Sequence, residues 1–118
     1  MERFVSLKKN DDFGRVYRQG RSYGNKLLVM YILERGQDQE SRIGISVSKK
    51  VGNSVVRHRI KRLIRESFRT HKELWRAGYD IVVIARQDAS NKDYQKIESA
   101  LMHLGKHHNI VYSEGESV

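Results

Sequence analysis

The chain of 118 residues is long enough for one domain, and it carries a strong positive charge. Its 23 Lys and Arg outnumber its 14 Asp and Glu, which gives a net charge of +9 at pH 7. This charge favours a polyanionic partner, either nucleic acid or an anionic membrane. The absence of cysteine excludes a disulfide framework, thiolate catalysis, iron–sulfur clusters and cysteine-based zinc sites.

The distribution of apolar residues gives no sign of a membrane protein. The longest apolar run, residues 27–33, is seven residues long and too short to cross a membrane. The first nine residues lack the apolar core of a secretory signal peptide. We therefore expect a soluble, cytoplasmic protein.

The first half of the chain predicts one short helix followed by extended segments. Asn10 is expected to cap the helix and Gly20 to end it. Residues 22–33 are rich in Leu, Val, Ile and Tyr and are expected to be extended, with a polar turn following over residues 34–41. Apolar residues alternate with small or polar ones over residues 42–48, which predicts a strand with two different faces.

The second half predicts two helices on either side of a buried strand. Residues 54–72 have helical apolar spacing, and Asn53 precedes them as a candidate cap. The strand is expected over residues 80–86, which are almost continuously apolar. Ser90, followed three residues later by Asp93, resembles a capping box for the last helix.

The last helix is expected to be amphipathic and to stop near Gly105. The tail over residues 109–118 is polar at its end and is expected to fray. The resulting order of elements is α-β-β-α-β-α. It predicts a single α+β domain over residues 1–118, with one sheet packed by helices.

The excess of positive charge is concentrated in residues 42–72. This segment holds ten Lys and Arg and a single acid, Glu66. On a helical wheel of residues 54–72, the basic side chains cover a broad arc beside an apolar stripe. Basic residues repeat there at i,i+4, a spacing that is mildly unfavourable in an isolated helix. The repeat consists of Arg57, Lys61, Arg65 and Arg69.

Three interpretations of this basic face are open. Most charged helix faces are merely solvated, but such faces normally pair acids with bases at i,i+4. A membrane-surface helix is disfavoured because the domain needs the apolar side of the helix for its core. A polyanion-binding helix fits best, since the planar guanidinium of arginine matches two phosphate oxygens at once.

The sequence from Val51 to Glu66, VGNSVVRHRIKRLIRE, resembles the signature helix of the protein subunit of bacterial ribonuclease P. The family pattern is G-N-x-V-x-R-N-x-x-K-R-x-x-R-E, and residues 52–66 match it with one departure, His58 in place of the family's Asn. Further matches lie at residues 7–13, 42–50 and 80–86 and extend the resemblance over about residues 6–105.

The resemblance implies an α-β sandwich like the second domain of ribosomal protein S5, with an uncommon left-handed crossover between two parallel strands. It also implies the protein component of an endoribonuclease that removes the 5′ leader of precursor tRNA. Hydrolysis would be carried out by the RNA subunit with Mg²⁺, so this chain would supply no catalytic side chain and bind no metal or cofactor itself. The implied partners are ribonuclease P RNA and precursor tRNA, with neither a membrane nor DNA expected.

The resemblance further implies two sets of RNA-binding residues. The catalytic RNA would contact the basic helix and the turn before it, at Lys49, Lys50, Asn53, Arg57, His58, Arg59, Lys61, Arg62, Arg65 and Arg69. The leader would lie in a cleft between the first helix and the sheet, lined by Phe13, Tyr17, Tyr31, Arg42, Ser46 and Ser48. Aromatic side chains stack on bases of any sequence, which suits a protein that handles many leaders. Without the resemblance, the three aromatic residues favour the core.

Other functional patterns are weak or absent. His103, His107 and His108 lack a third metal ligand fixed by sequence, so surface histidines are expected. The sequence contains no nucleotide-binding loop, zinc-protease motif or nucleophile elbow. Two rivals to the ribonuclease P interpretation are a structural RNA-binding protein, such as a ribosomal component, and a DNA-reading helix. The second is disfavoured because no helix-turn-helix partner precedes residues 54–72.

Overall fold

Five strands form one mixed sheet in the order β1-β4-β5-β3-β2. The structure is a computed structural model, which describes residues 4–112. The strands are β1 (Phe4–Ser6), β2 (Arg21–Gly24), β3 (Leu28–Glu34), β4 (Ser41–Ser46) and β5 (Tyr79–Ala85). The helices are α1 (Asn10–Gln19), α2 (Ser54–Thr70) and α3 (Tyr94–His107), with short 3-10 helices at η1 (Lys72–Leu74) and η2 (Gln87–Ala89).

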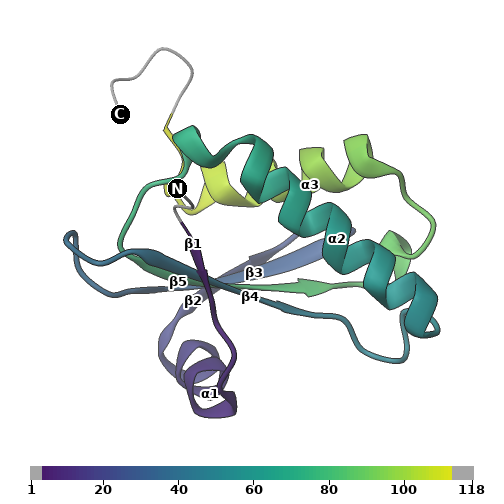
Figure 1. Ribbon diagram of the computed structural model, residues 1–118, viewed down its shortest axis with the longest axis horizontal. Helices are drawn as coiled ribbons and strands as arrows, with labels where there is room; N and C mark the ends of the chain where they lie inside the picture. The colour runs from purple at the N-terminus through teal and green to yellow at the C-terminus, as the bar shows by residue number, and fades with distance from the viewer. Residues whose placement is uncertain (1–3, 113–118) are drawn as a thin grey trace.

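The helices lie on both faces of the sheet. Figure 1 shows α2 and α3 together above the sheet and α1 alone below it. The apolar run of β5 is buried on both sides. Ile81 and Val83 belong to the large core between the sheet and helices α2 and α3, and Val82 belongs to a small core between the sheet and α1. This two-sided burial explains why β5 is apolar without alternation.

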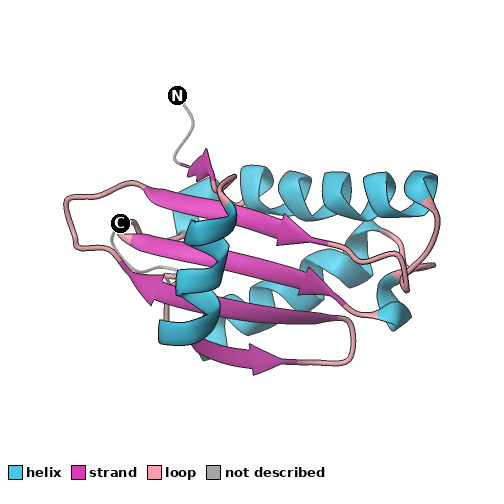
Figure 2. Ribbon diagram, turned by 90° about the horizontal axis from the view of Figure 1, so that it is seen from below, coloured by secondary structure: helices cyan, strands magenta, loops and turns pink. Residues whose placement is uncertain are grey.

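The crossover from β4 through α2 to β5 is left-handed. The two strands are parallel neighbours, with Arg42 opposite Asp80 and Ser46 opposite Ile84. Figure 2 views the sheet from the α1 side, where β4 and β5 run in the same direction and α2 lies on the far side, along the β4 edge of the sheet. Nearly all such crossovers are right-handed, so no general rule predicts this one. It agrees with the α+β sandwich that the family resemblance implies.

Two local predictions in the first half of the chain are wrong. Lys9, not Asn10, occupies the N-cap position of α1, and no side chain caps the helix. Asp11 and Asp12 in the first turn favour the helix N-terminus electrostatically instead. Residues 22–33 form not one strand but most of the hairpin of β2 and β3. In its turn the Asn25 side chain accepts hydrogen bonds from the backbone N–H groups of Leu27 and Leu28. No pattern in the sequence predicted strand β1.

Of the predicted caps of the two later helices, that of α2 is confirmed and that of α3 is wrong. The Asn53 side chain accepts a hydrogen bond from the Val56 N–H and caps α2, as predicted. Ser90 does not cap α3, because the chain first makes the short helix η2 and leaves the cap to Asp93. The Asp93 carboxylate accepts from the Lys96 N–H at 3.0 Å.

Helix α3 ends at His107, close to Gly105 as predicted, but Gly105 itself lies within the helix and does not cap it. A Cβ at this position would come within 2.6 Å of Val111 and 2.7 Å of Trp75, so the glycine permits close packing of the chain that follows. Ile110 and Val111 are buried, and Val111 forms a β-bridge with Trp75. The tail is therefore packed through Tyr112, and the remainder of the segment expected to fray, residues 113–118, lies outside the described residues.

Candidate nucleic-acid interface

Helix α2 buries one side in the core and leaves the other for a partner. Ile60, Ile64 and Phe68 repeat at helical spacing and are almost completely buried against the sheet and α3. Their burial fixes the rotation of the helix, so the basic arc faces away from the sheet. Along the part of the chain that is described, no helix is long and apolar enough to cross a membrane.

Four basic side chains of α2 have no partner in the part of the chain that the structure describes. His58, Lys61, Arg62 and Arg65 make no ion pair or hydrogen bond to another described residue. The Nε of the half-buried Arg57 is itself buried and has no hydrogen-bond partner among the described residues. The four unpaired side chains lie on one arc of the helix. They are the groups best able to bind phosphate oxygens.

Two other predicted RNA-binding residues already have partners. The Arg59 guanidinium donates to the carbonyl oxygen of Lys92 and so ties α2 to the loop before α3. Arg69 pairs with Glu66 on the solvent side of the helix, and this hydrogen bond lowers the pKa of the Glu66 carboxyl. The structure therefore gives Arg59 a structural contact and partly neutralises Arg69.

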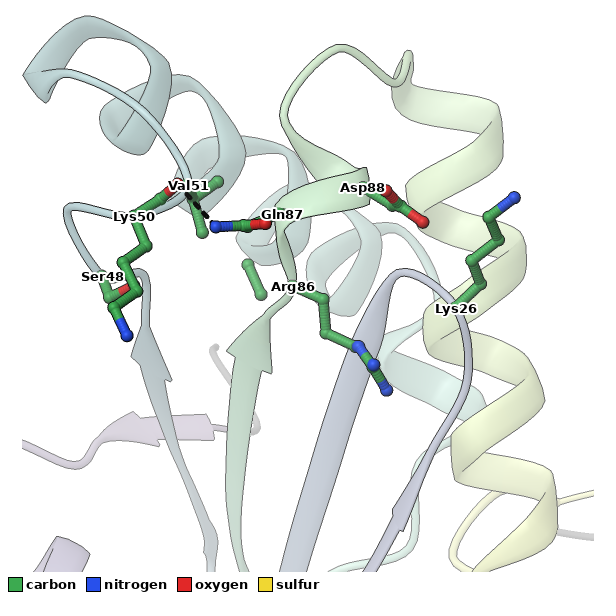
Figure 3. A pocket seen from close by; sticks show the side chains of 8 residues that line it. Lys26, Ser48, Lys50, Val51, Arg86, Gln87 and Asp88 are labelled. Atoms are coloured by element: carbon green, nitrogen blue, oxygen red, sulfur yellow. Dashed lines mark hydrogen bonds between the residues drawn. The ribbon is translucent and has the colours of Figure 1, made fainter.

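A basic pocket lies where β4 and β5 end, beside the turn between β2 and β3 (Figure 3). Its volume is about 380 Å³. It is lined by Lys26, Ser48, Lys50, Val51, Ala85, Arg86, Gln87 and Asp88. Gln87 donates to the Lys50 carbonyl at 3.4 Å, and Arg86 donates to the Asn25 carbonyl at 3.3 Å. Three cationic side chains against one carboxylate make this pocket suited to an anion.

The pocket includes residues that the sequence reasoning had separated or missed. Ser48 was assigned to the leader cleft and Lys50 to the contact with the catalytic RNA, yet the structure brings both to this site. Lys26 and Arg86 were not predicted. Arg86 directly follows β5, and ligands commonly bind at the carboxyl end of a parallel strand. Its place in the sequence could therefore have predicted it as a binding residue.

Three aromatic rings meet on the face of the sheet that α1 covers. The ring centroids of Phe13 and Tyr17 are 6.4 Å apart, and those of Tyr17 and Tyr31 are 5.0 Å apart in an edge-on arrangement. Tyr17 is 38% exposed and Tyr31 is half-buried. Burial raises the pKa of the Tyr17 phenol, and its hydrogen bond with Ser46 partly opposes that shift. The structure thus unites four of the predicted cleft residues.

Arg42, also predicted for the leader cleft, is held by two carboxylates. Its guanidinium donates two hydrogen bonds of 2.7 Å to the buried Asp80 carboxylate and lies 3.6 Å from Asp12 of α1. The hydrogen bonds to Asp80 raise the pKa of Arg42. Arg42 is therefore already engaged within the fold.

Two further arginines, neither predicted, complete an ion network around Asp80. Arg15 of α1 lies 2.8 Å from Asp12 and 3.8 Å from Asp80, and Arg35 lies 3.5 Å from Asp80. The Asp80 side chain is only 2% exposed. This network ties α1 to β4 and β5 and so fixes the helix that carries the aromatic rings.

Two of the three histidines near the C-terminus, His103 and His107, are exposed as expected, whereas the third, His108, is not. His107 stacks on Tyr23 with the ring centroids 3.4 Å apart, and His103 lies edge-on to the same ring. His108 is buried, with its Nε2 3.0 Å from the Met30 carbonyl oxygen, and burial lowers its pKa. Among residues 4–112, no group of three or more His, Cys, Asp or Glu is placed to hold a metal ion.

Comparison with known proteins decides the family. A family model described as Ribonuclease P matches residues 1–109. The chain belongs to the ribonuclease P protein family. The ribonuclease P protein component of Lachnoclostridium phytofermentans is 55% identical over 108 residues, which is 92% of each chain. That of Alkaliphilus oremlandii is 47% identical over 113 residues, which is 96% of this chain and 98% of the relative.

Solved structures of the same family share the fold. The RNase P protein of Staphylococcus aureus aligns with a TM-score of 0.83 at 43% identity, covering 90% of this chain and 96% of that one. The RNase P protein of Thermotoga maritima aligns with a TM-score of 0.79 at 34% identity, covering 86% and 96%. The family and the α+β fold inferred from the sequence are thereby confirmed.

Proposed function

We propose that this chain assists ribonuclease P RNA in removing the 5′ leader of precursor tRNA, by binding both RNAs. The single observation that carries the proposal is the unpaired basic arc of α2. His58, Lys61, Arg62 and Arg65 lie together there with no ion pair or hydrogen bond to any of residues 4–112. Uncompensated like charges destabilise a folded protein, and a polyanion removes that repulsion.

The leader of precursor tRNA would bind on the α1 side of the sheet. Tyr17 is partly exposed beside Tyr31 and Ser46, which offers a ring face and hydroxyl groups to a single strand. Base stacking on such rings tolerates any base. The basic pocket at the ends of β4 and β5 would take a backbone phosphate of RNA next to this surface. Arg42 is not included, because Asp80 and Asp12 engage its guanidinium.

The chemistry would belong to the RNA subunit and its Mg²⁺ ions. The proposed role of this chain is to bind and to position. Cationic side chains at the RNA interface offset phosphate repulsion, which Mg²⁺ alone must otherwise do. The protein is therefore expected to reduce the Mg²⁺ concentration that the reaction requires.

A reconstitution experiment tests this function. The chain is added to a bacterial ribonuclease P RNA and precursor tRNA at low Mg²⁺, and the release of the 5′ leader is measured. Cleavage should be strongly stimulated over the RNA alone. Stimulation by a variant with Lys61→Glu and Arg62→Glu should be weaker. Absence of stimulation by the unaltered chain would favour the rival interpretation, a structural RNA-binding protein.

A further inference from the structure

Val55 is the most exposed large apolar side chain in the described part of the chain. It lies in the first turn of α2 with 75% of its surface exposed, compared with 45% for Val5, the next in rank. Isolated apolar residues on a protein surface are common and need no explanation. The surroundings of Val55 are what make it informative.

Helical spacing places three basic side chains beside Val55. His58 and Arg59 follow at i+3 and i+4, and Arg62 follows two turns along the same face. His58 and Arg62 are exposed and have no ion pair or hydrogen bond to another described residue. The isopropyl group of Val55 therefore stands beside two of the side chains that are proposed to meet RNA, His58 and Arg62.

The fold itself gives no reason for a valine at this position. The next residue, Val56, packs against the large core, and its side chain occupies the space beside Gly52. Val55 is absent from both core clusters. Valine is also a weaker helix former than alanine, because its branched Cβ restricts χ1. Neither core packing nor helix formation accounts for Val55.

We propose that Val55 is the apolar centre of the contact between α2 and the catalytic RNA, where it packs against a ribose or a base edge. This inference rests on the proposed RNA contact of α2. The charge around Val55 selects RNA as the occupant over an apolar protein surface, which would leave His58 and Arg62 unpaired. The wide, shallow minor groove of an RNA helix exposes riboses and base edges to such a side chain.

Binding measurements over a range of salt concentrations distinguish this apolar contact from phosphate contacts. Phosphate contacts release counterions and set the slope of log K against log salt, whereas burial of two methyl groups does not. Val55→Ala should weaken binding to ribonuclease P RNA about ten-fold and leave the slope unchanged. Val55→Thr keeps the branched shape but replaces a methyl with a hydroxyl, and should also weaken binding. Alanine favours helix, so Val55→Ala should not lower the free energy of unfolding.

Two neighbouring substitutions serve as matched controls. Lys61→Ala removes a charge and should reduce the salt slope, and Val56→Ala should lower the free energy of unfolding. If Val55→Ala binds RNA normally while Lys61→Ala reduces affinity and slope, the inference is overturned and the proposed function stands. If neither changes binding, the RNA contact of α2 fails as well. A shift in self-association of the protein alone on Val55→Ala, seen by sedimentation without RNA, would make a second copy the occupant and overturn the inference.

Discussion

The ring of Phe13 on α1 lies directly against Gly44 on β4. A Cβ at Gly44 would come within 2.5 Å of Phe13 Cζ and 3.3 Å of Leu7 Cβ. The close approach of helix and strand therefore requires a glycine. It also seats the ring that begins the row Phe13, Tyr17, Tyr31.

Gly44→Ala should displace the Phe13 ring and destabilise the fold by about 1–3 kcal/mol, the usual effect of overpacking. Denaturant unfolding measures this change. Gly14→Ala in α1 is the matched control, since its Cβ would meet only the flexible end of Arg18. Alanine should stabilise the helix there by up to about 1 kcal/mol. Equal stabilities for the two variants would contradict the packing of Phe13 on Gly44.

Tyr17→Ala should weaken binding of a leader-bearing precursor tRNA by about 1–3 kcal/mol, the effect of losing one stacked base. The ring is partly exposed, so the free energy of unfolding should change little beside that of Phe13→Ala. Affinities for precursor and mature tRNA, measured with the holoenzyme, check the prediction. Equal losses for the two RNAs would exclude a leader contact.

The double substitution Lys61→Glu and Arg62→Glu should weaken binding to ribonuclease P RNA. Neither residue belongs to the core clusters, so the fold should survive. Each lost phosphate contact should reduce the magnitude of the slope of log K against log salt by roughly 0.7–0.9. Circular dichroism confirms folding beside the binding titration. A slope identical to that of the unaltered chain would remove this part of α2 from the RNA interface.

The position of α2 was predictable because its signals are local. Apolar residues repeat over 17 residues, and the cap Asn53 directly precedes them. Strand β1 has three residues and is defined by pairing with β4, which lies more than thirty residues away, so no local pattern revealed it. Gly105 has the residue type of a helix end, but contacts with Trp75 and Val111 determine its role. Local sequence cannot show such contacts.

The same difference between local patterns and distant contacts applies to the candidate site. The basic arc and the aromatic row follow from spacing and the family resemblance. The placement of Arg42 does not, because its partner Asp80 lies 38 residues along the chain and the pairing depends on the register of β4 and β5. The basic pocket brings Lys26 beside Arg86 because β3 and β5 are paired with Leu28 opposite Ala85, and this register also could not be predicted from local sequence.

His108 should make stability depend on pH. Burial lowers its pKa in the folded state, so below the ordinary histidine pKa of about 6.5 the unfolded chain binds more protons than the folded one. The contribution of neutral His108 is complete above that pH and is lost as pH falls through the folded-state pKa. Unfolding of the protein between pH 7.5 and 5 should show this loss, and His108→Gln should reduce it. The same pH dependence in both proteins would contradict the assignment to His108.

Asp80→Asn should destabilise the protein by about 3 kcal/mol, because removal of one partner from a buried ion pair leaves the other charge uncompensated. Here the Arg42 guanidinium loses its charged partner, and Arg15 and Arg35 lose the carboxylate that draws them together. Replacing both members, by Asp80→Leu with Arg42→Leu, should recover much of the loss, since apolar pairs often replace buried ion pairs without penalty. Denaturant unfolding of Asp80→Leu, Arg42→Leu and the double variant measures the coupling between the two residues. Additive losses would mean that Asp80 acts through another contact. Recovery in the double variant would instead show that Arg42 serves the fold as the partner of Asp80.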